Sequence, residues 1–266
     1  MAQTIIKIGI TEQGDAGIDL SWVKKLKNVA GAVLITKNIT DEFINHVIYL
    51  NNLNYKLIVH CTCTGFGGTE LEPNVPEYQN QLAQLSKLIQ KGFPISQCVL
   101  RIDPIIPTPK GFTKAGHVLD LAAAMGFFNK SNHGGQKLRV RISIMDEYNH
   151  VKARFRNKGW PMVYTGFQAS TEQLTNVLQF LNQYYLTFEI CAENDLYNFG
   201  KCYPGLLEVV GCISIKDLSI MNLPNYSNAM INPQNRNGCH CLAGKTELLS
   251  TKKQCSNGCV YCYWRS

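Results

Sequence analysis

Three cysteines near the end of the sequence have the spacing of a metal-binding motif. They are Cys255, Cys259 and Cys262, which form a Cys-x3-Cys-x2-Cys pattern within CSNGCVYC. Thiolates are soft ligands that suit iron, and three of them on one loop can hold three corners of a [4Fe-4S] cluster. A fourth protein ligand would close such a cluster, whereas three leave one iron open to a small molecule. The spacing therefore favours an iron–sulfur cluster with an open coordination position.

The residue before the third cysteine favours a particular type of cluster. In the radical S-adenosylmethionine motif the open iron binds the amino and carboxylate groups of S-adenosylmethionine. One electron, which a reductant protein would supply, then cleaves the sulfonium and generates a 5′-deoxyadenosyl radical. That motif favours an aromatic residue before the third cysteine, and Tyr261 occupies this position. We therefore predict that Tyr261 packs against the adenine of the cofactor.

A closed zinc site is the alternative for the same region. Cys239 and Cys241, together with Cys259 and Cys262, would provide four sulfurs for a tetrahedral zinc ion. Cys255 would then be surplus. The spacing and the tyrosine favour the cluster, in which case Cys239 and Cys241 could ligate a second metal, supply a redox pair or shape the loop.

The remaining cysteines and the start of the chain indicate the class of protein. The 11 cysteines are an odd number, and the first residues, MAQTIIKIGI, do not form a signal peptide, so a disulfide framework is not expected. No apolar run approaches the ~18 residues of a membrane span, and we expect a cytoplasmic protein without membrane contact. Six cysteines lie mostly in apolar runs, where we expect core positions: Cys61, Cys63, Cys98, Cys191, Cys202 and Cys212.

Short β-branched runs alternate with longer amphipathic stretches along the chain. We expect helices at 21–29, 76–92 and 170–184, the last capped by Ser170. This alternation is typical of βα units and a parallel sheet. We predict an α/β fold, a (β/α) TIM-like barrel that is complete or incomplete, with an open doubly wound sheet as the alternative. The predicted strands are 5–10, 31–36, 56–63, 97–102, 137–144, 185–191 and 208–215.

The barrel should comprise residues 1–234, and residues 235–266 should form a cysteine-rich tail packed on the same domain. Active sites of such barrels lie beyond the carboxyl ends of the strands, so the tail should place its iron–sulfur loop over the barrel mouth. Pro104 disfavours helix at Asp103, so Arg101 and Asp103 should lie on one face of an extended strand. Substrate or cofactor contacts are predicted for the charged residues at strand ends: Lys37, Arg101, Asp103, Asp146 and Glu193.

A glycine-rich segment follows the third predicted strand. The segment GFGGTE, residues 65–70, is similar to the Gly-Gly-Glu element with which radical S-adenosylmethionine enzymes bind the amino group of the cofactor. Glycines let the backbone approach a ligand closely. Gly67, Gly68 and Glu70 are therefore predicted to bind S-adenosylmethionine.

The net charge of +7 favours an anionic partner without identifying it. The alternative to an enzyme is a non-catalytic nucleic-acid-binding protein with a structural zinc or iron–sulfur knob, which would present Lys252, Lys253, Tyr263, Trp264 and Arg265. Because the charge is modest and no recognised nucleic-acid module is present, we favour a small-molecule or peptide-sized substrate. Seven basic residues could form a phosphate-facing rim: Lys137, Arg139, Arg141, Lys152, Arg154, Arg156 and Lys158.

A succession of short motifs resembles a bacterial and phage family catalogued as a domain of unknown function. That family has a C-terminal cysteine cluster like that of radical S-adenosylmethionine proteins. The resemblance implies the fold and the cluster, and it implies no substrate. The chain departs from the family pattern at ITEQGDAG (10–17) and LAGKTELLSTKKQ (242–254). The matching motifs are ITKN (35–38), TCTGFGGTELEPNVP (62–76), RIDPI (101–105), ISIMDEY (142–148), CAEN (191–194), NRNGCHC (235–241) and CSNGCVYCY (255–263).

Overall fold

Eight parallel strands form one sheet in the computed structural model, which describes residues 7–160, 163–164, 166–191, 193–223, 240–250 and 255–264. Seven strands overlap the ranges predicted from β-branched runs. The eighth, a short polar segment, was not predicted. The strands are β1 (Ile8–Ile10), β2 (Gly31–Thr36), β3 (Leu57–Thr62), β4 (Cys98–Ile105), β5 (Arg139–Ile144), β6 (Phe188–Ile190), β7 (Leu207–Val209) and β8 (Lys245–Glu247).

The strands are arranged in chain order, with β8 added beside β1. The sheet order is β7-β6-β5-β4-β3-β2-β1-β8, and every pair is parallel. Within the described ranges β7 and β8 do not pair, so the sheet is not closed. The mixed α/β fold with a parallel sheet is confirmed. The tail predicted at 235–266 also supplies β8 to this sheet.

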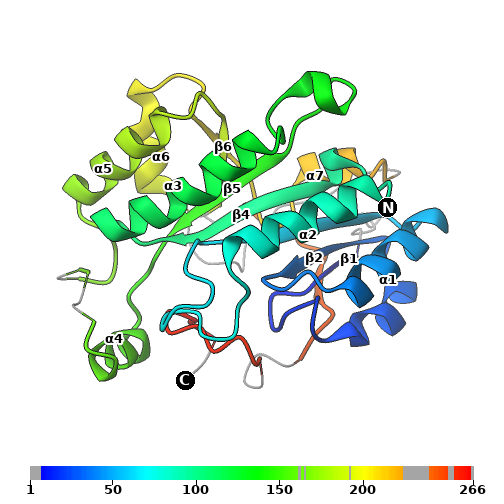
Figure 1. Ribbon diagram of the computed structural model, residues 1–266, viewed down its shortest axis with the longest axis horizontal. Coiled ribbons are helices and arrows are strands. Elements are labelled where there is room, and N and C mark those ends of the chain that lie inside the picture. The colour runs from blue at the N-terminus through cyan, green and yellow to red at the C-terminus, as the bar shows by residue number, and fades with distance from the viewer. Residues whose placement is uncertain are drawn as a thin grey trace, which may run out of the picture.

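The helices predicted at 76–92 and 170–184 are present as α2 and α5, whereas α1, α3, α4, α6 and α7 lie outside the predicted ranges (Figure 1). Ser170 and Gln173 form a capping box at the start of α5, as the sequence indicated for Ser170. The predicted helix at 21–29 is a 3₁₀ helix, η1 (Leu20–Asn28). No described helix combines the length and apolar character needed to cross a membrane. The α-helices are α1 (Asp41–Asn52), α2 (Tyr78–Gln90), α3 (Pro109–Ala124), α4 (Asn149–Asn157), α5 (Thr171–Asn182), α6 (Asn194–Phe199) and α7 (Ile215–Ile220).

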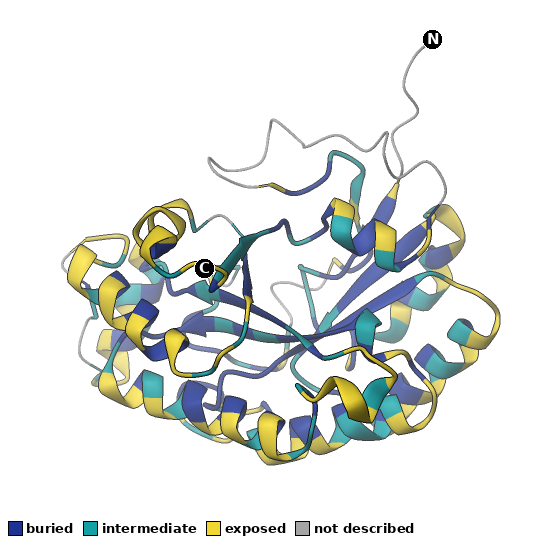
Figure 2. Ribbon diagram, turned by 90° about the horizontal axis from the view of Figure 1, so that it is seen from above, coloured by how far each residue is buried: buried dark blue, intermediate teal, exposed yellow. Residues whose placement is uncertain are grey.

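The two faces of the sheet have different surroundings. On one face Leu34, Val59 and Leu100 pack against α1, α2 and α3 in a large apolar core. On the other face Ile10 and Val33 contact the short helix α7. Figure 2 shows helices with exposed outer surfaces lining mainly one side of the buried strands. The face of the sheet that contacts α7 is called the inner face below. Because α7 covers only part of this face, polar side chains beyond α7 face a cavity.

Candidate active site

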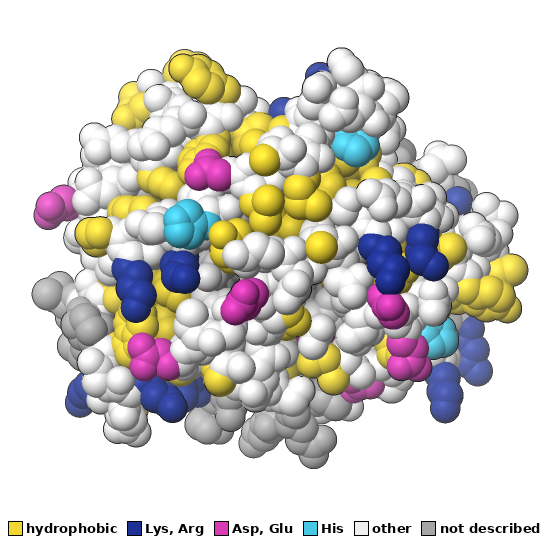
Figure 3. Space-filling model, in the orientation of Figure 1, with side chains coloured by type: hydrophobic (Ala, Val, Ile, Leu, Met, Phe, Trp, Pro, Cys, Tyr) yellow, Lys and Arg dark blue, Asp and Glu magenta, His cyan; other side chains and the backbone are white. Residues whose placement is uncertain are grey.

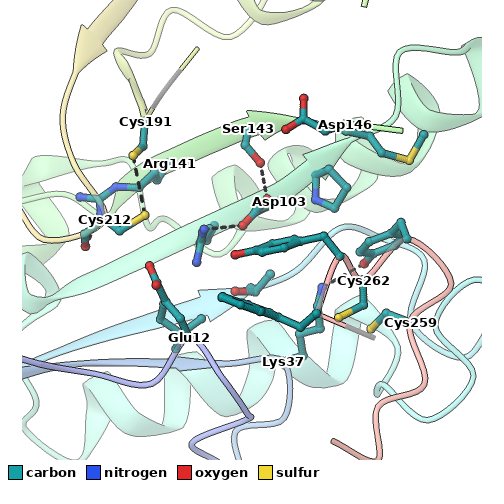
Figure 4. A pocket seen from close by; sticks show the side chains of 18 of the residues that line it. Glu12, Lys37, Asp103, Arg141, Ser143, Asp146, Cys191, Cys212, Cys259 and Cys262 are labelled. Carbon is teal, nitrogen blue, oxygen red and sulfur yellow. Dashed lines mark hydrogen bonds and ion pairs between the residues drawn. The ribbon is translucent and has the colours of Figure 1, made fainter. Parts of the chain in front are cut away.

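One cavity of about 450 Å³ gathers the predicted site residues beyond the carboxyl ends of the strands. It brings together all five charged residues predicted at strand ends, which are Lys37, Arg101, Asp103, Asp146 and Glu193. Tyr261 and the C-terminal cysteines also line it, opposite a second group of cysteines (Figure 4). The position is where parallel α/β proteins bind their ligands.

Arg101 and Asp103 form an ion pair in the wall of this cavity. Arg101 Nη2 lies 2.5 Å from Asp103 Oδ2, with side chains 17% and 26% exposed. They lie on the same face of β4, as predicted, and Ser143 donates its hydroxyl hydrogen bond to Asp103. Burial alone would lower the pKa of Arg101, but Asp103 together with Cys212, Glu12 and Tyr263 outweighs this effect, and the pKa is raised. Arg101 therefore stays charged and can hold an anionic group in a fixed direction.

Lys37 links a buried carboxylate to the C-terminal loop. Its ammonium lies 2.7 Å from Glu72 Oε1 and donates a hydrogen bond of 3.0 Å to the Tyr261 hydroxyl. The Tyr261 hydroxyl also hydrogen-bonds Glu72. Burial alone would lower the pKa of Lys37, whereas Glu72 and Cys259 raise it above its ordinary value. A permanent positive charge therefore lies beside the Cys259 thiol.

The C-terminal loop is held against the sheet from the β1 side. Asn257 donates a 2.6 Å hydrogen bond to Asp15, a buried carboxylate after β1 that also accepts from the Thr36 hydroxyl at 2.5 Å. Gly258 has φ of 70°, a conformation that favours glycine. The motif CSNGC thus has local reasons for its Asn and its Gly.

A second set of contacts holds the loop from the opposite side. Val260 N donates to Leu71 O at 3.0 Å. Arg154, on α4, donates to Val260 O at 2.8 Å and also to Cys262 O. The segment after β3 and helix α4 therefore both fix the position of Cys259 and Cys262.

The thiols of Cys255, Cys259 and Cys262 interact with one another in this loop. Burial raises the pKa of the Cys259 thiol to about 12, Lys37 opposes the shift, and the other two thiols add to it. Among the described residues these three sulfurs are not a set that all lie within 4.8 Å of one another, the spacing that would suit a single ion. Their arrangement is more open than a mononuclear zinc site requires.

A second group of thiols lies across the cavity. Cys191, Cys212 and Cys241 have sulfurs that all lie within 4.8 Å of one another, so these three cysteines could hold a metal ion. Cys212 Sγ is 3.7 Å from Cys191 Sγ, and the Cys212 amide donates to Cys241 Sγ at 3.1 Å. Of the alternative zinc set of Cys239, Cys241, Cys259 and Cys262, the described Cys241 lies with Cys191 and Cys212 and not with the C-terminal thiols. Cys239 lies outside the described residues.

The core prediction for the six dispersed cysteines was correct for three of them. Cys61, Cys63 and Cys98 are buried in the apolar core. Cys202 is exposed, and Cys191 and Cys212 line the cavity. Cys191 directly follows β6 and Cys212 lies three residues after β7, and this position at a strand end could have identified them as site residues. Their apolar neighbours in the sequence favoured the core interpretation instead.

The glycine-rich segment lies beside the cavity and not in its lining. A side chain on Gly67 would come within 1.9 Å of Pro76 O, and Gly68 has φ of 74°, so both glycines are needed for the turn. Glu70 is exposed, whereas Glu72 is the buried carboxylate of this segment. Cofactor binding by Gly67, Gly68 and Glu70 stays a prediction.

Three of the residues predicted to form a phosphate-facing rim point inward. Arg139 and Arg141 are paired with Glu189 and Asp217 on the inner face of the sheet, at 2.8 to 3.5 Å. Arg154 binds the C-terminal loop. On the surface in Figure 3, basic side chains are scattered, with acidic ones close to several of them. The prediction of a phosphate-facing rim is therefore wrong for these three arginines. Their guanidinium groups pair with carboxylates or donate hydrogen bonds to backbone carbonyls within the protein.

The aromatic end of the chain also meets the cavity. Tyr263 and Trp264 line it, with ring centroids 4.8 Å apart, and Tyr148 stacks on Tyr263 at 5.9 Å. Lys252, Lys253 and Arg265, the cations predicted to accompany them, lie outside the described residues. Tyr148, Tyr263 and Trp264 therefore line the same cavity as both groups of cysteines.

A protein-family profile matches most of the chain. The sequence profile of a family described as Domain of unknown function (DUF1848) matches residues 19–264. This span includes both groups of thiols and confirms the resemblance to a domain of unknown function, whereas the type of cluster stays a prediction. No curated protein matches the chain.

Proposed function

We propose that this chain, which belongs to the family described as Domain of unknown function (DUF1848), is a radical S-adenosylmethionine-like iron–sulfur enzyme. The observation that carries the proposal is the convergence of Cys255, Cys259 and Cys262 on a cavity lined by charged strand-end residues. An electron-transfer or structural cluster has no need for such a cavity.

The sheet is best understood as a (β/α) barrel that is open at one seam. Its strands follow chain order without the reversal of a doubly wound sheet. At the seam between β7 and β8, Leu242 N donates to Ile213 O at 3.1 Å. The C-terminal loop lies at the carboxyl ends of the strands, where barrel enzymes hold their active sites.

The C-terminal thiols fit the cluster by number, spacing and charge. Three thiolates leave one corner for a small molecule, and sulfurs at the corners of a cubane are farther apart than the ligands of one ion. A bound iron cluster removes the thiol protons, so the raised pKa of Cys259 belongs to the metal-free state. The Lys37 ammonium offsets negative charge on the thiolates. Cys255, Cys259 and Cys262 would therefore hold the cluster.

When bound, the cluster and S-adenosylmethionine would supply a 5′-deoxyadenosyl radical that removes a hydrogen atom from a substrate. The protein's part is to bind, orient and exclude water. A cavity of about 450 Å³ fits a small molecule or part of a peptide. Arg101 can bind an anionic group there, and Tyr148, Tyr263 and Trp264 offer rings for an adenine or a substrate. Packing of Tyr261 on adenine stays part of the proposal.

The test is anaerobic reconstitution with iron and sulfide, followed by addition of S-adenosylmethionine and a reductant. We expect a brown protein that forms 5′-deoxyadenosine. Cys255→Ala, Cys259→Ala and Cys262→Ala should each abolish both the colour and the product. Cys202→Ala, which changes an exposed cysteine away from the cavity, is the matched control and should retain both. A protein that takes up no iron at these three thiols would overturn the proposal.

A further inference from the structure

The second thiol group combines residues from three distant parts of the chain. Cys191 follows β6, Cys212 follows β7, and Cys241 precedes β8. Buried or half-buried cysteines in a core have no reason to place their sulfurs together. Here all three sulfurs lie within 4.8 Å of one another, and all three residues line the cavity.

The distance between two of these sulfurs suits one thiophilic ion. Zinc binds thiolate sulfur at about 2.3 Å, so two sulfurs at the tetrahedral angle lie ~3.8 Å apart. Cys191 Sγ and Cys212 Sγ are 3.7 Å apart. The third sulfur, of Cys241, accepts the Cys212 amide at 3.1 Å, a hydrogen bond that also stabilises a thiolate.

Charged groups of both signs surround the trio of Cys191, Cys212 and Cys241, and Glu12 is the acidic group that acts on Cys212. Arg141 Nη1 donates to the Cys212 carbonyl at 3.1 Å and so fixes the backbone that carries this thiol. Arg101 and Lys245 also interact electrostatically with Cys212. A zinc ion with three thiolates has a net charge of −1. Each of these cations also pairs with a carboxylate, Asp103, Glu189 or Glu12, so they reduce the electrostatic cost of that charge only in part.

We propose that Cys191, Cys212 and Cys241 bind one zinc ion whose fourth coordination position is open to the cavity. Three protein ligands with one position for water or substrate are typical of catalytic zinc sites. The site would take a water molecule or a sulfur, nitrogen or oxygen donor of the substrate. The inference does not depend on the proposed radical activity, because it concerns other thiols.

The first test measures zinc, iron and copper in purified protein without reconstitution. The variant in which Cys255, Cys259 and Cys262 are all alanine should retain one zinc per chain. Cys191→Ala, Cys212→Ala and Cys241→Ala should each lose it, and Cys202→Ala should keep it. The three trio variants should keep the far-ultraviolet circular dichroism spectrum of the unaltered chain, which shows that they fold. Zinc that remains in all three trio variants, or copper as the only metal, would overturn the proposal.

The second test uses the unaltered chain, so it does not depend on the folding of a variant. Zinc K-edge absorption should show three sulfur neighbours at about 2.3 Å. Cys191, Cys212 and Cys241 should resist alkylation until zinc is removed by a chelator. Four sulfur neighbours, or a disulfide between Cys191 and Cys212 in zinc-free protein as isolated under anaerobic conditions, would contradict an open three-thiolate site.

Discussion

Two buried carboxylates, Glu72 and Glu189, hold cations that the cavity depends on. Glu72 is 1% exposed and pairs with Lys37 beside the cysteine loop. Glu189 binds Arg139 and Arg141 on the inner face of the sheet. A buried ion pair costs desolvation energy, and removing one partner leaves the other charge without compensation. Both carboxylates therefore allow direct tests of how charge supports this site.

Glu72→Gln should destabilise the protein strongly, because it leaves the Lys37 ammonium in a mostly buried position without its carboxylate. Breaking a buried pair costs about 3–5 kcal/mol, and Lys37 is partly exposed, so we expect about 3 kcal/mol. Urea unfolding at pH 7 measures the loss. Glu42→Gln, an exposed substitution on α1, should change the free energy of unfolding by less than about 0.5 kcal/mol. A loss below about 1 kcal/mol for Glu72→Gln would mean that this pair is not important for stability.

Glu189 should make the protein acid-sensitive. Burial alone would raise the pKa of Glu189, but Arg141 and Arg139 lower it from 4.5 to about 2. A carboxyl whose pKa is lower in the folded state stabilises that state above the unfolded pKa. This contribution, about 3 kcal/mol for such a shift, is lost as the pH falls from 4.5 towards 2. Unfolding free energies across this range measure it.

The matched variant for this prediction is Glu189→Gln. It should be less stable than the unaltered chain at pH 7, with a difference that shrinks as the pH approaches 2. Equal dependence on pH in the two proteins would show that other carboxyl groups cause the acid sensitivity.

At the scale of elements, the C-terminal loop depends on helix α4. Arg154 donates to the carbonyls of Val260 and Cys262, and hydrogen bonds from a charged group contribute about 1.5–3 kcal/mol each. Arg154→Ala should therefore weaken retention of iron by the loop at least tenfold in competition with an iron chelator. Arg156→Ala, an exposed change on the same helix, should have no effect. Similar iron retention in the two variants would show that α4 does not fix the loop.

The sequence predicted elements that have strong local signals. Seven strands and the helices at 76–92 and 170–184 follow from β-branched runs, helical periodicity and a capping residue, which act over a few residues. Strand β8, with the sequence KTE, has no such pattern and exists because β1 offers a free edge. The contact between Leu71 and the C-terminal loop could not be predicted from the sequence either, because it joins residues far apart in the chain.

The candidate site was predictable to the extent that strand ends could be located. Lys37, Arg101 and Glu193 meet in one cavity because parallel strands end at one edge. Cys191 and Cys212 were missed, because a cysteine in an apolar run has the same pattern whether it packs or binds metal. Arg139 and Arg141 were predicted to lie on the surface, because their carboxylate partners are on other elements and give no local signal. Pairing between residues distant in the sequence therefore determined where these cysteines and arginines lie.

At the scale of the whole molecule, one cavity is lined by both groups of thiols, the C-terminal loop cysteines and the trio of Cys191, Cys212 and Cys241. The C-terminal loop is fixed by contacts to the β1 and β3 ends and to α4, whereas the trio lies at the seam between β7 and β8. In Figure 4, Cys191 and Cys212 face Cys259 and Cys262 across Asp103 and Ser143. Arg101 and Asp103 line the same cavity. The integrity of the seam should therefore affect one thiol group more than the other.

Gly211→Ala tests this division directly. A methyl group at Gly211 would lie 2.6 Å from His240 O and 2.7 Å from the Cys241 Cα, and these backbone atoms cannot rotate away. Forcing an added methyl group into a packed site costs about 1–3 kcal/mol, so the free energy of unfolding should fall by that amount. The displaced Cys241 should also lose its contact with Cys212, and zinc should be lost while iron uptake at the C-terminal loop persists. Gly166→Ala, where the structure leaves open space, is the control. Loss of iron together with zinc would mean instead that the seam supports the whole cavity and that the two thiol groups are not independent.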